Sequence, residues 1–406
     1  MRFLLVHPNF PSQLRSMATA LASDPKNEVV FLTKAQEGSL KGVKKLLYTP
    51  KREASAQTHH YLRGIESAVL QGQAAFETCV AAKRAGFVPD VIVGHAGWGP
   101  TLFLKDVFPR TPMALNFEWF YRSHGSDCDF DPSEPVTADD EARIRMKNST
   151  LLADLAACDG GVCPTRYQFE QFPAHLRSQF LISHEGIDTR FFQPDPSARI
   201  VLPKLNVDLS GATEIVTYAT RGMEPYRGFP QFMEAAHLLL QQRPKTHVVV
   251  AGDDRVAYGK AAPKGKTYKQ LMLEKFPMDA ARLHFVGSLP YGDYVKLLQA
   301  TSVHVYLTRP FVLSWSMLEA MSCGALVVAS DTAPVREVIA DGVNGLTTDF
   351  FKPEEIAATI GKALEEPKRF EHLRRNARQT ILGKYELGTC LRQRLDWVGK
   401  LMNAGS

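Results

Sequence analysis

The second half of the chain contains a loop whose residue types are suited to binding phosphate. The segment from Tyr218 to Pro230 reads Tyr-Ala-Thr-Arg-Gly-Met-Glu-Pro-Tyr-Arg-Gly-Phe-Pro, between an apolar strand and an amphipathic helix. It places a glycine after each of two arginines, Arg221 and Arg227. Arginine presents a planar, permanently charged fork that matches phosphate oxygens, and a glycine such as Gly222 lets the backbone approach a ligand closely. The loop therefore predicts a phosphate site.

A second segment, about ninety residues later, adds groups that suit a sugar hydroxyl. It reads Ser-Trp-Ser-Met-Leu-Glu-Ala-Met-Ser-Cys-Gly from Ser314 to Gly324, with one carboxylate, Glu319, in an otherwise apolar run. A helix N-terminus attracts anions, and a carboxylate one turn into the helix can accept hydrogen bonds from sugar hydroxyls. Together the two segments predict a site for a nucleoside diphosphate attached to a sugar.

Length and composition are those of a folded, two-domain protein. The chain has 406 residues, and this length is too great for one hydrophobic core. Its residues are 45% hydrophobic and 22% charged, as in a folded protein. It has no run of about eighteen apolar residues and no signal peptide at its start, so we expect no membrane span. The six cysteines form no CxxC pair, which favours reduced thiols and a cytoplasmic location. A net charge of +5 fits an anionic small ligand or weak contact with anionic lipid at the inner membrane face, and does not favour nucleic acid.

Alternating apolar and helical segments predict an α/β fold with parallel sheets. The apolar runs are Phe3–Val6, Val29–Leu32, Val91–Val93 and Met113–Leu115, then Ile215–Ala219, Val248–Ala251, His284–Val286, Val303–Leu307 and Ala325–Ala329. The periodicity breaks between Arg190 and Ser210. We expect two doubly wound, Rossmann-like domains, 1–190 and 191–384, facing a central cleft that holds the ligand, with a helix in 385–406 returning to the first domain.

A dinucleotide or ATP site is not supported. The run Gly97-Trp-Gly99-Pro-Thr-Leu has only two of the three glycines of GxGxxG, and no GxxxxGK[ST] occurs. Neither NAD nor ATP is therefore expected as a cofactor.

Five motifs, in order and spacing, resemble the retaining glycosyltransferases of family 4, which have the two-domain GT-B fold. The chain's versions are His184-Glu-Gly-Ile-Asp188, Val249-Val-Ala-Gly252-Asp, His284-Phe-Val-Gly287, Glu319-Ala-Met-Ser-Cys-Gly324 and Asn344-Gly345-Leu. The resemblance covers the whole chain and is strongest from Ile182 to Asp349. It implies that 1–190 binds the acceptor and 191–384 the nucleotide sugar.

The resemblance also assigns roles to individual residues of the donor site. Arg221 and Arg227 would bind the diphosphate, Gly287 would lie beside the nucleotide base, and Glu319 would hold the ribose hydroxyls. Where relatives carry the carboxylate that meets the transferred sugar, this chain has Phe311, which leaves the backbone amides of Val312, Leu313 and Ser314. Donor hydroxyls are then bound from elsewhere, or the chain has lost activity.

Four residues of the first domain are candidates for the acceptor side and for catalysis. His95 and Glu118 follow predicted strands that point at the cleft, although a lone histidine or glutamate there can equally be structural. Ser12 and Gln13 follow the first strand, where backbone N–H groups could approach the diphosphate from the opposite domain.

The acidic segment from Ser126 to Glu141 fails as a calcium loop, because Pro132 and Ala138 stand where glycine and glutamate are required. We therefore expect no metal site and interpret the segment as a solvated loop. The resemblance implies metal-independent transfer, with retention, of a sugar from a UDP- or GDP-linked donor to a hydroxyl acceptor. The acceptor could be a glycan, a lipid-linked glycan, a protein or a small molecule. Two alternatives are a sugar-nucleotide epimerase or hydrolase, and a catalytically silent sugar-nucleotide-binding protein.

Overall fold

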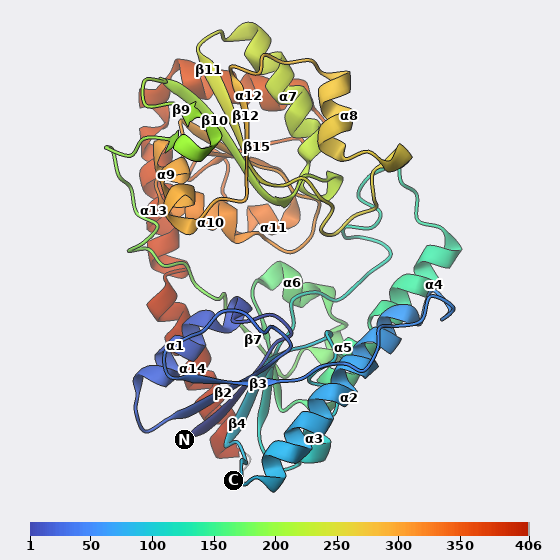
Figure 1. Cartoon of the computed structure of the whole chain (residues 1–406). Helices are drawn as coiled ribbons and strands as arrows, with labels where there is room; N and C mark the ends of the chain where they lie inside the picture. Colours follow the sequence, from blue (N-terminus) through green and yellow to red (C-terminus); the bar gives the residue numbers. More distant parts are fainter. Residues whose placement is uncertain (405–406) are drawn as a thin grey trace. The chain divides into compact units, whose positions relative to one another are not determined.

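The computed structural model describes residues 1–404, apart from the side chains of Lys264 and Ala404. The chain forms two compact units, one made of Met1–Glu185 with Thr389–Ser406 and the other of Gly186–Gly388 (Figure 1). The domain limits that we expected, at 190 and 384, lie a few residues from these.

Unit 1 is built on a seven-stranded sheet in which every neighbouring pair is parallel. Its spatial order is β3-β2-β1-β4-β5-β6-β7. The strands are β1 (Arg2–Val6), β2 (Glu28–Thr33), β3 (Val43–Leu47), β4 (Val91–His95), β5 (Met113–Asn116), β6 (Gly160–Cys163) and β7 (Phe180–Ile182). The central strands are continuous apolar runs because both faces of the sheet are covered.

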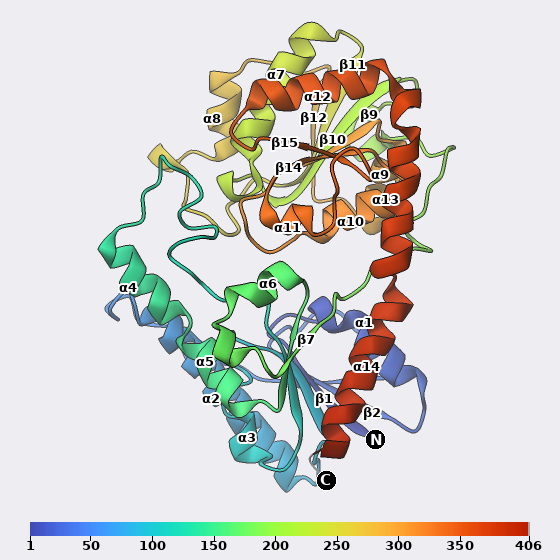
Figure 2. The ribbon, with the colours of Figure 1, turned by 180° about the vertical axis from the view of Figure 1, so that it is seen from behind.

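Helices cover the two faces of this sheet. They are α1 (Arg15–Ser23), α2 (Arg63–Arg84), α3 (Leu104–Val107), α4 (Ala138–Lys147), α5 (Ser149–Ala157), α6 (Arg166–Gln171) and α14 (Leu387–Ala404). One core cluster joins β1 and β4 to α2, α3 and α5, and the other joins them to α1 and α14. Figure 2 shows α14 along the sheet, where a Cβ on Gly160 would lie 2.6 Å from the Trp397 ring, so the close packing there requires glycine.

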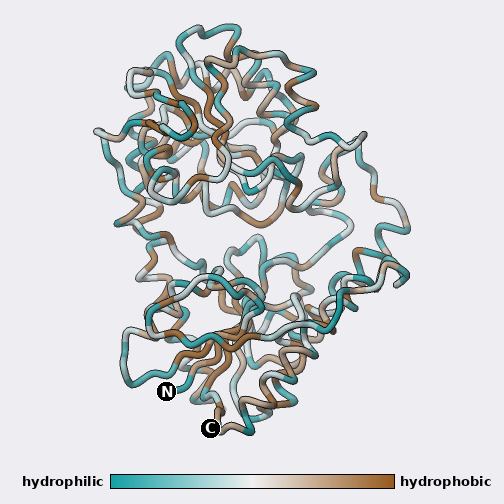
Figure 3. Tube along the Cα trace, viewed as in Figure 1, coloured by the Kyte–Doolittle hydropathy of each residue, from teal (hydrophilic) through white to brown (hydrophobic). Residues whose placement is uncertain are grey.

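Unit 2 repeats this plan with a six-stranded parallel sheet of order β12-β11-β10-β13-β14-β15. The strands are β10 (Glu214–Gly222), β11 (Thr246–Asp253), β12 (Leu283–Gly287), β13 (Val303–Tyr306), β14 (Val327–Ser330) and β15 (Leu346–Thr348). A separate antiparallel pair joins β8 (Val201–Leu202) to β9 (Val207–Asp208). Hydrophobic segments gather in the interior of each unit in Figure 3.

The helices of unit 2 surround its sheet. They are α7 (Phe229–Gln242), α8 (Tyr268–Lys275), α9 (Tyr291–Ala300), α10 (Trp315–Ser322), α11 (Ala333–Arg336), α12 (Pro353–Glu365) and α13 (Glu371–Lys384). All of them except α8 bury apolar residues. Residues of α9, α10 and α13 share one core cluster with β13 and β14, while α7 and α12 pack together. None of the helices described is long and apolar enough to cross a bilayer.

Each sheet has a point where the order of its strands reverses. In unit 1 it lies between β1 and β4, and in unit 2 between β10 and β13. In open parallel sheets, loops at the carboxyl ends of the strands diverge at such a point and leave room for a ligand. The carboxyl ends of these four strands are therefore where a site is expected.

Candidate functional site

Arg227 lies at the strand-order reversal of unit 2. It ends a short 3-10 helix, Pro225–Arg227, that follows β10, and only 6% of the residue is exposed. Its Nη1 donates to the hydroxyl of Tyr306 at 3.1 Å, the hydroxyl of Thr308 at 2.9 Å and the carbonyl of Val312 at 3.0 Å. The loop after β13 therefore fixes a guanidinium supplied by the loop after β10. Sequence reasoning selected Arg227 but none of these hydroxyl partners.

Gly228 makes this close packing feasible. Its φ is +63°, and a Cβ there would lie 2.5 Å from the Cβ of Leu307. Only glycine meets both conditions without strain. Gly228 thus allows α7 to begin directly after the Arg227 loop.

The first turn of α10 is linked to Arg227 through Tyr306. The Tyr306 hydroxyl accepts the backbone N–H of Ser314 at 2.8 Å as well as the Arg227 N–H. Ser314 is the N-cap of α10, and its hydroxyl lies 3.0 Å from that of Ser316. Of the three amides that we expected to remain for the donor, the amide of Ser314 already has an internal acceptor. The side chain of Leu313 is buried in the core cluster around α10.

Glu319 is buried within α10, with 5% of the residue exposed. Its Oε2 accepts a hydrogen bond from the Tyr294 hydroxyl of α9 at 3.0 Å. Burial raises the pKa of Glu319 to about 7, and the Tyr294 hydrogen bond opposes that rise. The carboxyl group therefore titrates near neutrality, and in its ionised form it can accept hydrogen bonds from a diol.

The surroundings of Arg221, Gly222 and Gly287 differ from those of Arg227. Arg221 is exposed at the end of β10, and no hydrogen bond or ion pair among the described residues joins it to Arg227. A Cβ on Gly222 would lie 2.6 Å from the Arg255 carbonyl, so glycine allows the loop after β11 to approach β10. Gly287 ends β12 with φ +65°, and a Cβ added there would meet no atom within 4 Å beyond its chain neighbours.

Phe311 stands among aromatic rings beside the Arg227 guanidinium. Its ring meets those of Tyr226 and Tyr258 edge-on, with centroids 5.4 Å and 5.2 Å away. The Arg227 guanidinium carbon lies 5.8 Å from the Phe311 centroid. Phe311, at the position where relatives carry a carboxylate, therefore places an aromatic ring close to Arg227, the residue expected to bind phosphate.

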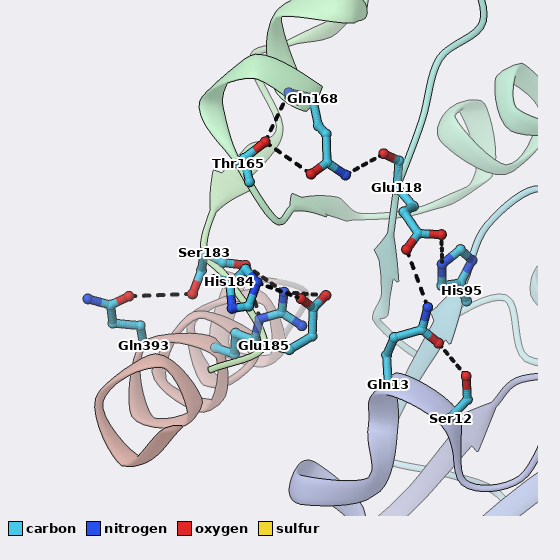
Figure 4. Close-up of polar contacts among 11 residues, drawn as sticks. Ser12, Gln13, His95, Glu118, Thr165, Gln168, Ser183, His184, Glu185 and Gln393 are labelled. Carbon is cyan, nitrogen blue, oxygen red and sulfur yellow. Dashed lines mark hydrogen bonds and ion pairs between the residues drawn. The ribbon is translucent and has the colours of Figure 1, made fainter. Parts of the chain in front are cut away.

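The four residues singled out in unit 1 form one cluster at the strand-order reversal of its sheet (Figure 4). His95 ends β4, and its Nε2 lies 3.6 Å from Oε2 of Glu118, which follows β5. Gln13 donates its side-chain N–H to Oε1 of Glu118 at 3.4 Å, and the Ser12 hydroxyl donates to the Gln13 side-chain oxygen. The Glu118 side chain remains 34% exposed, whereas that of His95 is 5% exposed.

Two histidines in this cluster have opposite protonation tendencies. Burial alone would lower the pKa of His95. The hydrogen bond and charge of Glu118, together with the hydrogen bond to the Ala96 carbonyl and the charge of Glu185, outweigh burial and raise it. His7 follows β1, and its ring lies edge-on to that of His95 at 5.3 Å. Burial, together with the charge of His95, lowers the pKa of His7 to about 3. The cluster therefore pairs Glu118 with His95, whose pKa is raised, and places the neutral His7 beside them.

Two further groups escaped sequence reasoning because their partners are distant in the chain. Gln168 of α6 donates its side-chain N–H to the backbone carbonyl of Glu118 at 2.6 Å. Arg394 of α14 donates to the Ser183 carbonyl, at 3.2 Å from its Nε, and to Oε1 of Glu185 at 3.1 Å. The first part of the His184–Asp188 motif is thus fastened to the last helix of unit 1.

The acidic segment between Ser126 and Glu141 is not solvated throughout. Asp127 is only 2% exposed, and the Ser126 hydroxyl donates to its Oδ1 at 3.1 Å. Asp129 accepts the backbone N–H of Gly125 at 2.8 Å. Among residues 1–404, no three His, Cys, Asp or Glu side chains are grouped as ligands for one metal ion.

Comparison with known families agrees with this architecture. Residues 25–192 match the family described as "Glycosyl transferase family 4 group", and residues 208–380 match "Glycosyl transferases group 1". Curated relatives include the D-inositol 3-phosphate glycosyltransferase of Acidothermus cellulolyticus, 25% identical over 47% of this chain and 41% of the relative. Another is the N,N'-diacetylbacillosaminyl-diphospho-undecaprenol alpha-1,3-N-acetylgalactosaminyltransferase of Campylobacter jejuni, 24% identical over 50% of this chain and 49% of the relative. The match thus spans less than half the length of each of these relatives.

Solved structures share the fold over nearly the whole chain. HepE from Anabaena, crystallised with UDP and glucose, has a TM-score of 0.70 at 16% identity, covering 98% of this chain and 100% of that one. Sucrose-phosphate synthase from Thermosynechococcus elongatus has a TM-score of 0.71 at 17% identity, with full coverage of both chains. The two parallel sheets, the family matches and these likenesses agree, and the chain belongs to the family 4 glycosyltransferases with the GT-B fold.

Proposed function

We propose that this glycosyltransferase moves a sugar from a UDP- or GDP-linked donor to a hydroxyl acceptor, with retention of configuration and without a metal ion. The observation that carries the donor assignment is the buried guanidinium of Arg227, joined through the Tyr306 hydroxyl to the first turn of α10. The HepE structures in complex with UDP and glucose and with UDP-glucose support a nucleotide-sugar donor.

Arg227 and Arg221 would stabilise the leaving group. When the bond between C1 of the sugar and the phosphate oxygen breaks, negative charge grows on the nucleoside diphosphate. A guanidinium already fixed by Tyr306, Thr308 and Val312 reorganises little as that charge develops, which is the condition for effective electrostatic stabilisation. The exposed Arg221 would add a second positive charge, and the N-terminus of α10 a partial one.

Glu319 would hold the ribose. Its carboxylate is fixed by Tyr294, and it lies within α10, the helix whose first residues are joined to Arg227 through Tyr306. Ribose hydroxyls do not change during transfer, so this contact would serve binding more than the chemical step.

The acceptor hydroxyl would attack C1 on the face from which the phosphate leaves. A bond then forms between the acceptor oxygen and C1, and the acceptor proton passes to the departing phosphate oxygen. Glu118, held by Gln13 and His95 and one-third exposed, is our candidate for orienting the acceptor hydroxyl. The acceptor itself stays a hydroxyl compound of undefined class: glycan, lipid-linked glycan, protein or small molecule.

One specific observation favours a second candidate, binding without transfer: Phe311 stands where relatives carry a sugar-binding carboxylate. Incubation with a panel of UDP- and GDP-sugars, measuring nucleoside diphosphate release with and without acceptor extracts, distinguishes transfer, hydrolysis and binding alone. Release that depends on an acceptor supports transfer, and release without one indicates a hydrolase. Tight nucleotide binding without any release would replace the transferase proposal with the binding protein.

A further inference from the structure

Three aromatic residues, Tyr226, Tyr258 and Phe311, form what we name the aromatic wall. Phe311 meets both tyrosines edge-on, and the two tyrosine centroids are 6.5 Å apart. Phe311 is 7% exposed, whereas Tyr258 is 39% exposed. Within the aromatic wall, Phe311 is therefore buried, and Tyr258 has a ring that solvent or a ligand can reach.

The wall stands directly beside the proposed phosphate ligand. The Arg227 guanidinium carbon lies 5.3 Å from the centroid of Tyr258 and 5.8 Å from that of Phe311. The guanidinium carbon of a second buried arginine, Arg309, lies 5.2 Å from the centroid of Tyr226. A ligand group attached to a phosphate bound at Arg227 would thus be within reach of the aromatic rings.

A buried carboxylate holds Tyr258 in this place. Glu224 is fully buried, and its two oxygens accept the consecutive backbone N–H groups of residues 257–259. The distances are 3.1 Å from Ala257, 3.0 Å and 3.1 Å from Tyr258, and 2.8 Å from Gly259. Because these bonds occupy the carboxylate, Glu224 fixes the loop and has few acceptor positions left for a sugar hydroxyl.

The linear order of a nucleotide sugar decides which part of it meets the wall. With the ribose at Glu319 and the diphosphate at Arg227, the group beyond the diphosphate is the transferred sugar. Phe311 and Val312 belong to the same loop, and Val312 supplies an acceptor to Arg227. The sugar would therefore leave the phosphate site past Phe311 and Tyr258.

We propose that the aromatic wall selects a donor sugar bearing a methyl group, either a 6-deoxyhexose or an N-acetylated hexosamine. This inference rests on the proposed donor site at Arg227. A hydroxyl pressed against aromatic carbon loses its hydrogen bonds to water without replacement, whereas a methyl group gains by leaving water. Glu224 acts as a positioning residue, since it reaches the sugar only through Tyr258.

Matched donor pairs test the proposal by calorimetric titration, which requires no acceptor. UDP-6-deoxyglucose and UDP-N-acetylglucosamine are each compared with UDP-glucose, and GDP-6-deoxymannose with GDP-mannose. We expect at least one methyl-bearing donor to bind about tenfold more tightly than its plain hexose partner. The pair that shows the preference tells whether the methyl group belongs to C6 or to an acetamido group. Equal or tighter binding of the plain hexose in every pair would overturn the proposal.

Variants test whether the wall causes the preference. The measured ratio is the dissociation constant of the plain hexose donor divided by that of its methyl-bearing partner. Phe311→Glu should bring this ratio toward one or below it, while the matched control Phe311→Leu should keep it above one. Because Phe311 is buried, Tyr258→Ser, at an exposed ring, provides a second variant that keeps the core intact, and it too should reduce the ratio. Glu224→Gln should reduce the ratio in the same direction if the loop positions Tyr258. If the ratio were unchanged in both Phe311→Glu and Tyr258→Ser, the aromatic wall would not be the cause of the preference.

Titration with UDP and GDP alone separates this proposal from the donor-site assignment. If a nucleoside diphosphate binds and the matched pairs show no methyl preference, the wall proposal is wrong and the donor site stands. If neither UDP, GDP nor any sugar nucleotide binds, the donor site fails and the wall proposal fails with it.

Discussion

One hydroxyl group joins Arg227 to the start of α10. The hydroxyl of Tyr306 accepts an N–H of Arg227 at 3.1 Å and also the backbone N–H of Ser314 at 2.8 Å. Two elements at the strand-order reversal of unit 2, the Arg227 loop and the first turn of α10, therefore share one acceptor. A diphosphate bound there would meet a guanidinium and a helix N-terminus whose relative positions are already fixed.

Replacing Arg227 by alanine should lower kcat/KM for the donor by about ten- to hundredfold, the effect of losing one charge-assisted bond to phosphate. The loss can be larger, because leaving-group charge peaks in the transition state. The substitution also removes a donor to Tyr306, Thr308 and Val312 inside the protein, so the melting temperature should fall as well. Arg227→Lys should recover part of the activity, since it restores charge without the fork.

Arg221 provides the matched control, because it is exposed at the end of β10. Arg221→Ala should lower kcat/KM without changing the melting temperature. The measurements are steady-state kinetics and a thermal melt of each variant. Wild-type kinetics in a folded Arg227→Ala protein would contradict the diphosphate assignment.

Donor binding should depend on the ionisation of Glu319. Since burial raises the pKa of this carboxyl to about 7, it is protonated below that pH in the free protein and gains its full capacity to accept ribose hydroxyls above it. We expect the affinity for UDP or GDP to rise between pH 6 and pH 8, and Glu319→Gln to bind more weakly at pH 8 with a flatter profile. Calorimetric titration across this range measures both. If Glu319→Gln kept the wild-type dependence of affinity on pH, ionisation of Glu319 could not be its cause.

The same group has a consequence for stability. A carboxyl whose pKa is raised on folding contributes stability that is fully present below its unfolded value, near 4.5, and is lost as the pH rises through about 7. Glu319→Gln should therefore reduce the loss of stability between pH 4.5 and pH 7 in urea unfolding experiments.

Removal of the Glu118 charge should lower the pKa of His95. The hydrogen bond and charge of Glu118 hold that pKa above its ordinary value against burial, so burial should dominate in Glu118→Gln. Titration of the His95 ring by NMR, in wild type and variant, measures the shift. With a known acceptor, the variant should also lower kcat/KM for the acceptor far more than it lowers donor affinity. An unshifted His95 titration would show that the 3.6 Å pair does not persist in solution.

Transfer should survive a chelator. Arg221 and Arg227 bring two positive charges to the proposed diphosphate site, where a divalent ion would otherwise neutralise the leaving group. Activity is measured after dialysis against EDTA and again after adding Mg²⁺ or Mn²⁺. Loss of transfer that a divalent ion restores would refute the metal-independent proposal and direct attention to the acidic residues between Asp127 and Asp131.

The sequence by itself determined the features that depend on neighbouring residues. Alternating apolar and helical segments predicted two doubly wound parallel sheets, because a strand buried on both faces must be apolar throughout. Two arginines, each followed by a glycine in a loop between strand and helix, predicted a phosphate site there. Local spacing also placed Glu319 one turn into a helix, and the family motifs gave the GT-B fold.

Tertiary structure decided which distant groups meet at each site. Arg227 and Tyr306 are 79 residues apart in the chain, and they meet because β13 lies beside β10 in the sheet. In the same way His7, His95 and Glu118 come together only when β1, β4 and β5 are neighbours. Local propensity carries no information about such strand order, because the pairing energy arises between segments that are separated in the chain. The burial that raises the pKa of Glu319, and the fastening of residues 257–259 by Glu224, follow from that packing and could not be read from the residues alone.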